Sequence, residues 1–162
     1  MAIEKKAVVA FSGGLDTSFC VGHLLDAGYT VHTVTTDTGG FSSSELSEIK
    51  EVSKKLGAES HITVDARAEM FDRFGAYVVK AHILRGGVYP LCVGAERTVQ
   101  AEHTAKLASE IGADAICHGC TGAGNDQVRF DLALRTLAPE KQIIAPIREL
   151  ALSREQEAEF LQ

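Results

Sequence analysis

The stretch KAVVAFSGGLDTS, residues 6–18, decides the fold class of this 162-residue chain. Residues 6–11 form a short apolar run that ends at a Ser-Gly-Gly turn, a pattern typical of a strand buried on both faces. Residues 17–27 then predict a helix that closes at Gly28. The chain therefore opens with the strand, turn and helix from which α/β domains are built.

The same alternation continues along the chain. Ser42 and Glu45 fit a capping box, and Gly86, Gly87 and Pro90 mark a loop. We predict one domain of the α/β class, with a doubly wound, mostly parallel five-stranded sheet, helices on both faces and ligands at the carboxyl ends of the strands. Beyond the opening unit, strands are predicted at residues 29–35, 61–65, 113–118 and 142–145, and helices at 42–56, 67–79, 98–111 and from the glycine-rich stretch 119–124 to residue 135.

The composition excludes several partners. The chain has 16 Lys and Arg against 22 Asp and Glu, a formal net charge of −6, which disfavours binding to a nucleic-acid backbone. No stretch approaches the roughly 18 to 20 apolar residues of a membrane span, and the N-terminus runs into a strand pattern rather than a cleavable signal. We therefore expect a cytoplasmic protein without a nucleic-acid or membrane partner.

The chain has four cysteines, which are expected to stay reduced in that compartment: Cys20, Cys92, Cys117 and Cys120. Cys117 and Cys120 have C-x-x-C spacing, but one such pair alone is weak evidence for zinc. We interpret the cysteines as small apolar residues packed near a strand end, and we assign no set of metal ligands.

The loop at residues 10–18 is the strongest candidate site. It lies between a strand and a helix, where free backbone N–H groups and the helix dipole favour an anion such as phosphate. Glycines allow the backbone to turn and to approach oxygen atoms, and Ser12, Thr17 and Ser18 add hydroxyl groups. The loop has neither G-x-x-x-x-G-K-[ST] nor G-x-G-x-x-G. Without a lysine, its neutral donors suit a released pyrophosphate better than transfer of a γ-phosphoryl group.

The string S-G-G-x-D-[ST]-S resembles the signature of the ATP pyrophosphatases, which cleave ATP between its α- and β-phosphates. Within that group, SGGLDTS at residues 12–18 and HGCTGAGNDQVRF at residues 118–130 resemble segments of the argininosuccinate synthases. Weaker matches are Tyr89-Pro-Leu91 and Gly112-Ala-Asp-Ala115. Together the matches extend from residue 8 to about residue 148.

The resemblance implies an adenine nucleotide α-hydrolase-like fold and a ligase that uses ATP with Mg²⁺. Citrulline would attack the α-phosphate to form citrullyl-AMP and pyrophosphate, and aspartate would then displace AMP to give argininosuccinate, in arginine biosynthesis. It also implies three sets of binding residues: for ATP, Ala10, Phe11, Ser12, Gly13, Gly14, Leu15, Asp16, Thr17, Ser18, Thr36 and Gly119; for citrulline, Tyr89, Asn125 and Arg129; and for aspartate, Thr121, Asn125 and Asp126.

The side chains suit these roles, although each has a structural alternative. Arg129 offers a planar fork for a carboxylate, or it pairs with Asp131 or Glu149 on the surface. Tyr89 is a ligand or a packed loop aromatic, and His118 fits a strand-end residue held by hydrogen bonds better than a catalyst. Asp16 caps the helix or reaches a magnesium ion. No residue stands out as a nucleophile or general base, so catalysis is expected to rest on positioning and charge stabilisation.

The chain departs from the family pattern at three places. Gly94 stands where a hydroxyl residue is usual, and Ala123 replaces a lysine, while Arg97 keeps a positive charge nearby. A second, synthetase domain follows in the family and is absent here, and Ser153 with Gln156 opens a helix close to the end of the chain. We therefore expect residues 1–162 to be a nucleotide-binding domain that binds ATP without completing the ligation, and the full-length protein to be a homotetramer.

Two other functions stay open at this point. One is a tRNA-thiolating ATP pyrophosphatase, some of which combine such a loop with paired cysteines. The other is a module that senses nucleotides without catalysis. The acidic net charge, Leu15 and the NDQVR string at residues 125–129 argue against the first.

Overall fold

A computed structural model of the chain describes residues 5–82, 84–90 and 93–162. Its centre is a five-stranded sheet in the order β3-β2-β1-β6-β7, and each neighbouring pair of strands is parallel. The predicted fold class and the five predicted strands are confirmed, with these bounds: β1 Lys5–Ala10, β2 Tyr29–Asp37, β3 Ser60–Asp65, β6 Ala115–His118 and β7 Gln142–Ile144.

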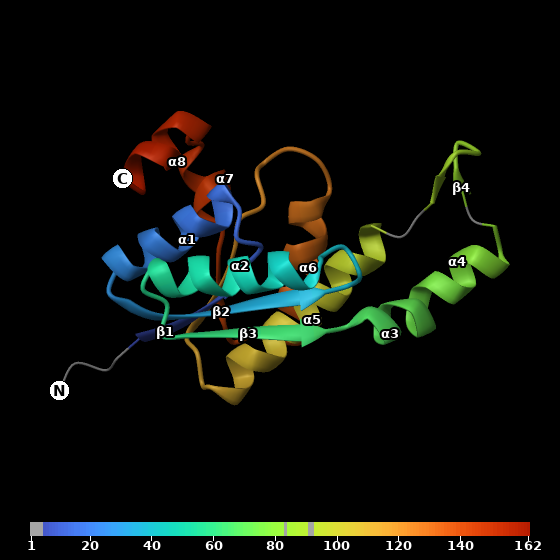
Figure 1. The fold of residues 1–162 in the computed structure, drawn as a ribbon, viewed down its shortest axis with the longest axis horizontal. Coiled ribbons are helices and arrows are strands. Elements are labelled where there is room, and N and C mark those ends of the chain that lie inside the picture. The colour runs from blue at the N-terminus through green and yellow to red at the C-terminus, as the bar shows by residue number, and fades with distance from the viewer. Residues whose placement is uncertain (1–4, 83, 91–92) are drawn as a thin grey trace.

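Helices cover both faces of the sheet, and each face has its own hydrophobic core (Figure 1). The alternation of side chains along β1 sends Ala7 and Val9 into one core and Val8 into the other. The first core is covered mainly by α1 Leu15–Asp26, α2 Ser43–Lys55 and α7 Pro146–Leu150, and the second by α5 Val93–Glu110 and α6 Asp126–Leu137. This arrangement explains the apolar run at residues 6–11, since β1 is buried on both sides.

Local signals set the ends of several helices as predicted. The Ser42 hydroxyl accepts a hydrogen bond from the amide of Glu45, and the Glu45 carboxylate accepts one from the amide of Ser42, which confirms the capping box of α2. The same reciprocal pair forms between Ser153 and Gln156, where α8 Arg154–Phe160 begins. α8 then packs against α1 (Figure 1).

The middle of the chain departs from the prediction. The helix expected at residues 67–79 is divided into α3 Arg67–Met70, a π-helical segment Phe71–Gly75 and α4 Ala76–Lys80. The expected loop contains a short antiparallel hairpin, β4 Leu84–Arg85 and β5 Tyr89–Pro90. Figure 1 shows these elements as an arm that extends beyond the carboxyl ends of the strands. α5 begins at Val93, five residues before the predicted helix, and α7 was not predicted.

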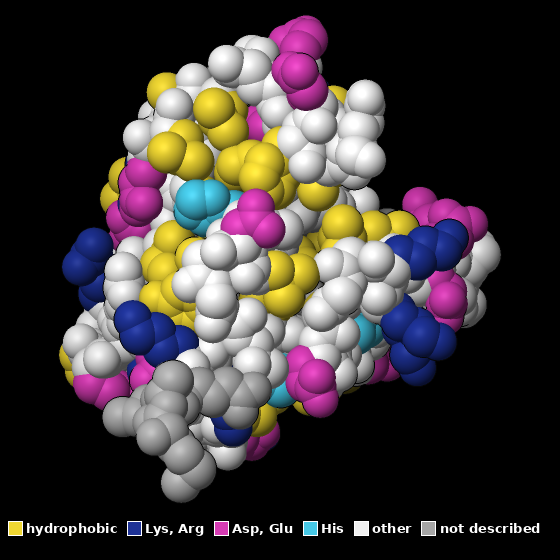
Figure 2. Space-filling model, turned by 90° about the vertical axis from the view of Figure 1, so that its left-hand side faces the viewer, with side chains coloured by type: hydrophobic (Ala, Val, Ile, Leu, Met, Phe, Trp, Pro, Cys, Tyr) yellow, Lys and Arg dark blue, Asp and Glu magenta, His cyan; other side chains and the backbone are white. Residues whose placement is uncertain are grey.

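Hydrophobic and charged side chains occupy different parts of the surface at the amino ends of the strands. Figure 2 shows hydrophobic side chains gathering on the upper half of this face, where α1 and α8 lie, with charged side chains around them. Phe160 of α8 packs on Phe19 of α1, with ring centroids 4.9 Å apart. α8 is therefore fixed to α1 by apolar contacts. Among the described residues, no helix is both long and apolar enough to cross a membrane.

Candidate functional site

The N-terminus of α1 presents backbone donors at the carboxyl end of β1. The first hydrogen bond within the helix runs from the amide of Ser18 to the carbonyl of Gly14, at 2.9 Å. The amides of Leu15, Asp16 and Thr17 therefore have no acceptor inside the helix. Within the described chain, no side chain caps this end of the helix. These amides and the positive end of the helix dipole form a ready site for a phosphate group.

The hydroxyl groups of the loop have different tasks. The Thr17 hydroxyl donates to the carbonyl of Gly14 at 3.1 Å and accepts from the amide of Ser12 at 3.3 Å, so it braces the turn. Ser12 is exposed, and its hydroxyl donates to that of Thr17 at 3.2 Å, whereas Ser18 is buried. Of the three predicted hydroxyl residues, Ser12 and Thr17 line the pocket described next, and Ser18 does not.

A pocket of about 550 Å³ lies over the carboxyl ends of β1, β2 and β6. It brings together most of the predicted ATP residues: Ala10, Phe11, Ser12, Gly14, Leu15, Asp16, Thr17, Thr36 and Gly119. Gly13 and Ser18 do not line it. A Cβ atom on Gly119 would lie 3.1 Å from Cγ2 of Thr17, so the two glycine-rich loops are in contact.

A second pocket of about 320 Å³ adjoins the first. Its lining includes the three predicted aspartate residues, Thr121, Asn125 and Asp126. Asp16 and Asp126 line both pockets. The structure therefore places the predicted aspartate site directly beside the predicted phosphate site.

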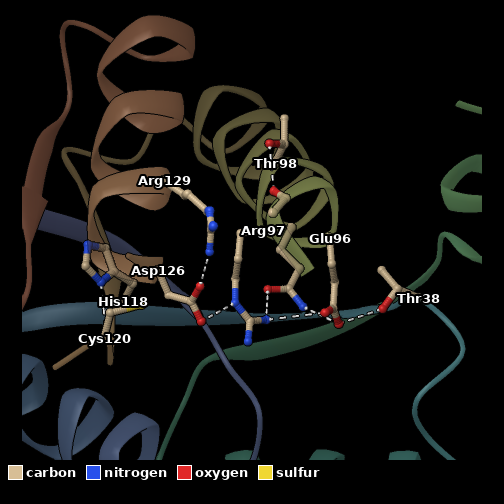
Figure 3. A network of polar contacts seen from close by, with 10 residues as sticks. Thr38, Glu96, Arg97, Thr98, His118, Cys120, Asp126 and Arg129 are labelled. Atoms are coloured by element: carbon tan, nitrogen blue, oxygen red, sulfur yellow. Dashed lines mark hydrogen bonds and ion pairs between the residues drawn. The ribbon is translucent and has the colours of Figure 1, made fainter. Parts of the chain in front are cut away.

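Asp126 is held between two arginines at the junction of the pockets (Figure 3). Its Oδ2 accepts from Nε of Arg97 at 3.1 Å, and its Oδ1 accepts from Nη1 of Arg129 at 2.8 Å. Partial burial by itself would raise the pKa of Asp126, but the bonds from Arg97 and then Arg129 outweigh it and lower the pKa. Arg129 therefore pairs with Asp126, and not with either Asp131 or Glu149.

Gly94 makes room for this arrangement. A Cβ atom on Gly94 would lie 3.3 Å from Nε of Arg129, so the guanidinium lies directly over the α5 backbone. The missing hydroxyl at residue 94 and the position of Arg129 are thus parts of one arrangement.

The larger pocket also has polar lining residues on α5 that the sequence analysis did not identify. Glu96 accepts from the hydroxyl of Thr38 at 2.9 Å and from the amide of Gln100 at 3.3 Å, and Gln100 in turn accepts from Arg97 (Figure 3). Glu96, Gln100 and Thr104 recur at the spacing of one helix face, which is the signal that could have identified them. Phe41 and Arg154 also line the pocket, and no pattern in the sequence around them indicates this.

His118 is a structural residue at the end of β6. Its Nδ1 accepts from the amide of Cys120 at 3.3 Å, so the proton lies on Nε2, which donates to Asp131 at 3.0 Å. Burial lowers the pKa of His118 and outweighs the opposite effect of Asp131. Asp131 also accepts from Arg148 at 2.9 Å. The ring is therefore neutral and held on both sides, in agreement with the hydrogen-bonded interpretation.

Tyr89 lies apart from the pockets. It belongs to β5 in the arm and is half-exposed, and it lines neither of the two pockets. Leu91, which follows it in the motif, falls outside the described residues. Asn125 and Arg129 are thus close to each other at the start of α6, while the structure does not bring Tyr89 to them.

The three thiols that the structure describes are buried or partly buried. Cys20 and Cys117 are fully buried in the first core, and burial followed by the neighbouring Cys20 thiol raises the pKa of Cys117 far above its usual range. Burial also raises the pKa of Cys120, to about 11. These three cysteines are packed groups as predicted, and Cys92 lies outside the described residues.

Comparisons with known proteins identify one family. The family described as the arginosuccinate synthase N-terminal HUP domain matches residues 6–162. The argininosuccinate synthase of Xanthomonas campestris pv. campestris is 48% identical over 147 residues, which are 91% of this chain and 36% of the relative. That of Methanocaldococcus jannaschii is 44% identical over 159 residues, which are 98% of this chain and 40% of the relative. The chain thus spans well under half the length of the curated relatives it matches.

Solved structures support the fold alone. The chain superposes on a 4-thiouridine synthetase, solved in complex with RNA and bound ATP, with a TM-score of 0.72 at 18% identity, over 96% of this chain and 39% of that one. An NH3-dependent NAD synthetase from Campylobacter jejuni gives a TM-score of 0.55 at 10% identity, over 74% of this chain and 49% of that one.

Proposed function

This chain belongs to the argininosuccinate synthase family, and on that premise we propose that it binds ATP with the phosphates on the N-terminus of α1 and presents the α-phosphate to citrulline. The observation that carries the proposal is the uncapped helix N-terminus that opens into the pocket between the ends of β1 and β6. Free amides and a helix dipole stabilise negative charge in place, without a lysine that would have to rearrange.

The amino-acid substrates are proposed to bind beside the phosphates. Arg129 offers a fork for the carboxylate of citrulline, and Asp126 offers a carboxylate for the ammonium group of aspartate. In the structure Arg129 and Asp126 pair with each other. Substrate binding would replace that pair by two others, Arg129 with the citrulline carboxylate and Asp126 with the ammonium group of aspartate. Asn125 and Thr121 line the same pocket and supply an amide and a hydroxyl.

The proposed reaction depends on positioning. The two pockets share Asp16 and Asp126, so a nucleotide in one lies next to an amino acid in the other. Holding an oxygen nucleophile close to the α-phosphate removes much of the entropic barrier. Arg97, at the junction, adds positive charge where phosphate charge develops. His118 is neutral and hydrogen-bonded on both sides, so it takes no part as a base.

The wider proposal covers the complete protein. Residues 1–162 act as its nucleotide-binding domain, and ligation of citrulline to aspartate, assembly as a homotetramer and a cytoplasmic location are proposed for the full-length protein. The net charge of −6 supports the absence of a nucleic-acid partner. The raised pKa values of Cys117 and Cys120 disfavour the thiolating alternative, which would need a reactive thiolate.

The test is exchange of labelled pyrophosphate into ATP, with and without citrulline, together with calorimetric titration of ATP. Citrulline-dependent exchange by the full-length protein is expected, with ATP binding by this chain. Ser12→Ala should weaken ATP binding, since it removes a hydroxyl that lines the pocket and bonds to Thr17. Thr136→Val is the matched control, because that exposed hydroxyl bonds only to its own helix at Leu132. ATP binding without any exchange would support a sensing module and refute the ligase.

A further inference from the structure

One acidic side chain beside the phosphate loop has a buried carboxylate oxygen without a hydrogen bond among the described residues. Glu157 of α8 is 2% exposed, and its Oε2 atom is buried without a hydrogen bond from any described residue. Acidic side chains are almost never buried unless they are paired, and a buried polar atom left alone costs free energy. The Oε2 atom therefore has room for a partner that the described residues do not supply.

The packing of α8 holds Glu157 in this place. Phe160 stacks against Phe19, and a Cβ atom on Gly22 would lie only 2.8 Å from Cε1 of Phe160, so the two helices are in close contact. The capping box at Ser153 fixes where α8 begins. Glu157 thus cannot move into solvent without breaking apolar contacts between α8 and α1.

The group that Glu157 faces is Asp16, in the first turn of α1. Burial, then the charge of Asp16 and a contact with its carboxyl group, raise the pKa of Glu157. Asp16 lines both pockets at the N-terminus of α1. Two carboxyl groups therefore lie side by side next to the pocket, where their charges repel each other unless a proton or a cation lies between them.

We propose that Glu157 and Asp16 together hold the divalent cation that enters with the triphosphate. Mg²⁺ takes oxygen ligands and is usually bound by one or two carboxylates, substrate phosphates and water. Within the described residues, no group of three or more His, Cys, Asp or Glu side chains is placed to hold a metal ion. The cation therefore needs phosphate oxygens to complete its ligands. This inference rests on the proposed binding of ATP, and it gives the orphaned Oε2 atom a partner.

The test is the effect of Mg²⁺ on ATP binding, measured by calorimetry in magnesium buffer and in EDTA. For the unaltered chain, Mg²⁺ should tighten ATP binding by about tenfold or more, in the range by which metal-site groups alter affinity. Glu157→Gln should reduce that ratio to about twofold or less, with ATP binding in EDTA unchanged or tighter, because a negative charge has been removed. Glu159→Gln is the matched control, since Glu159 lies on the same helix and is exposed.

A second readout observes the cation directly. The electron paramagnetic resonance signal of free Mn²⁺ should decrease on addition of chain and ATP beyond the decrease with ATP alone. Glu157→Gln and Glu157→Leu should both lose the additional decrease, and Glu159→Gln should keep it. The leucine variant preserves a filled, buried position, so a circular dichroism spectrum that matches the unaltered chain excludes misfolding as the cause.

The outcomes separate this inference from the proposed function. If Mg²⁺ tightens ATP binding by the same factor in Glu157→Gln as in the unaltered chain, the cation site is refuted and the two carboxyl groups merely share a proton. If ATP binds equally with and without Mg²⁺, the inference fails while the nucleotide site stands. If ATP does not bind in either buffer, the proposed function fails and the cation site with it.

Discussion

Replacing Gly13 by alanine tests how firmly the phosphate loop is held against α2. Gly13 has φ +75°, and a Cβ atom there would lie 2.9 Å from Cγ1 and 3.5 Å from Cα of Ile49. Ile49 is buried in the first core, in the middle of a helix fixed at its start by the Ser42 capping box. The clash cannot be relieved by rotation of a side-chain tip, so the loop or α2 must shift.

The magnitude follows from two separable costs. A left-handed conformation costs an L-residue about 1–2 kcal/mol. Forcing an extra carbon into a packed core costs about 1–3 kcal/mol more. Gly28 provides the control, because it has φ +82° with no atom within 4 Å of its added Cβ. Gly28→Ala should therefore cost only the first amount, and Gly13→Ala about 2–5 kcal/mol in free energy of unfolding.

The assay is urea unfolding followed by circular dichroism, on Gly13→Ala, Gly28→Ala, Ile49→Ala and the double variant at residues 13 and 49. Ile49→Ala removes Cγ1 and should itself cost about 2–5 kcal/mol. The double variant should cost less than the sum of its parts by about 1–3 kcal/mol, since the clash is then absent. Equal costs for Gly13→Ala and Gly28→Ala, or additive costs in the double variant, would refute the reasoning.

Three further predictions concern charge and protonation. Arg97→Ala should weaken ATP binding by about ten- to hundredfold in calorimetry, the scale of a lost bond to a charged group, whereas the exposed Arg135→Ala should not change it. Because burial lowers the pKa of His118 from 6.5, its neutral form contributes stability that is fully present above about pH 6.5 and decreases as pH falls below that value. Between pH 7 and 5, the urea midpoint of His118→Gln should therefore decrease less than that of the unaltered chain. An identical decrease in the two proteins would contradict this assignment. Burial raises the pKa of Cys120 to about 11, so little of its thiol is ionised at pH 8. In a Cys92→Ser variant, alkylation of Cys120 by iodoacetamide should therefore be slow at pH 8 and should accelerate toward pH 11. Rapid alkylation at pH 8 would show an ionised thiol and contradict this prediction.

The parts of the fold that the sequence predicts are those whose cause is local. The apolar run at residues 6–11 predicts β1 because a strand buried on both faces needs apolar residues throughout. The pairs Ser42 with Glu45 and Ser153 with Gln156 predict helix starts because the capping hydrogen bonds span only three residues. The phosphate loop is predicted for the same reason, since turn and helix N-terminus are adjacent in the chain.

The parts that the sequence does not predict depend on contacts between distant residues. The helix predicted at residues 67–79 contains a π-helical segment, in which Arg73 pairs with Glu69 of α3 and with Glu102 of α5. The charge of Arg129 was recognised, but its partner was not, because Asp126 is also bound by Arg97 from another helix. Glu157 carries no local signal at all, since its burial depends on how α8 lies against α1.

The strand order explains why the candidate site collects residues from such distant segments. β1 pairs with β2 on one side and with β6 on the other, so the chain reverses its winding direction at β1. Connections leave in opposite directions there, which opens a crevice beyond the carboxyl ends of the strands. Ala10 and His118 are partners in register, so the turn after β1 and the turn after β6 begin side by side. Gly119 allows those turns to touch, because any side chain at residue 119 would press on Thr17 and Asp16 and separate the phosphate loop from the residues proposed to bind the amino acids.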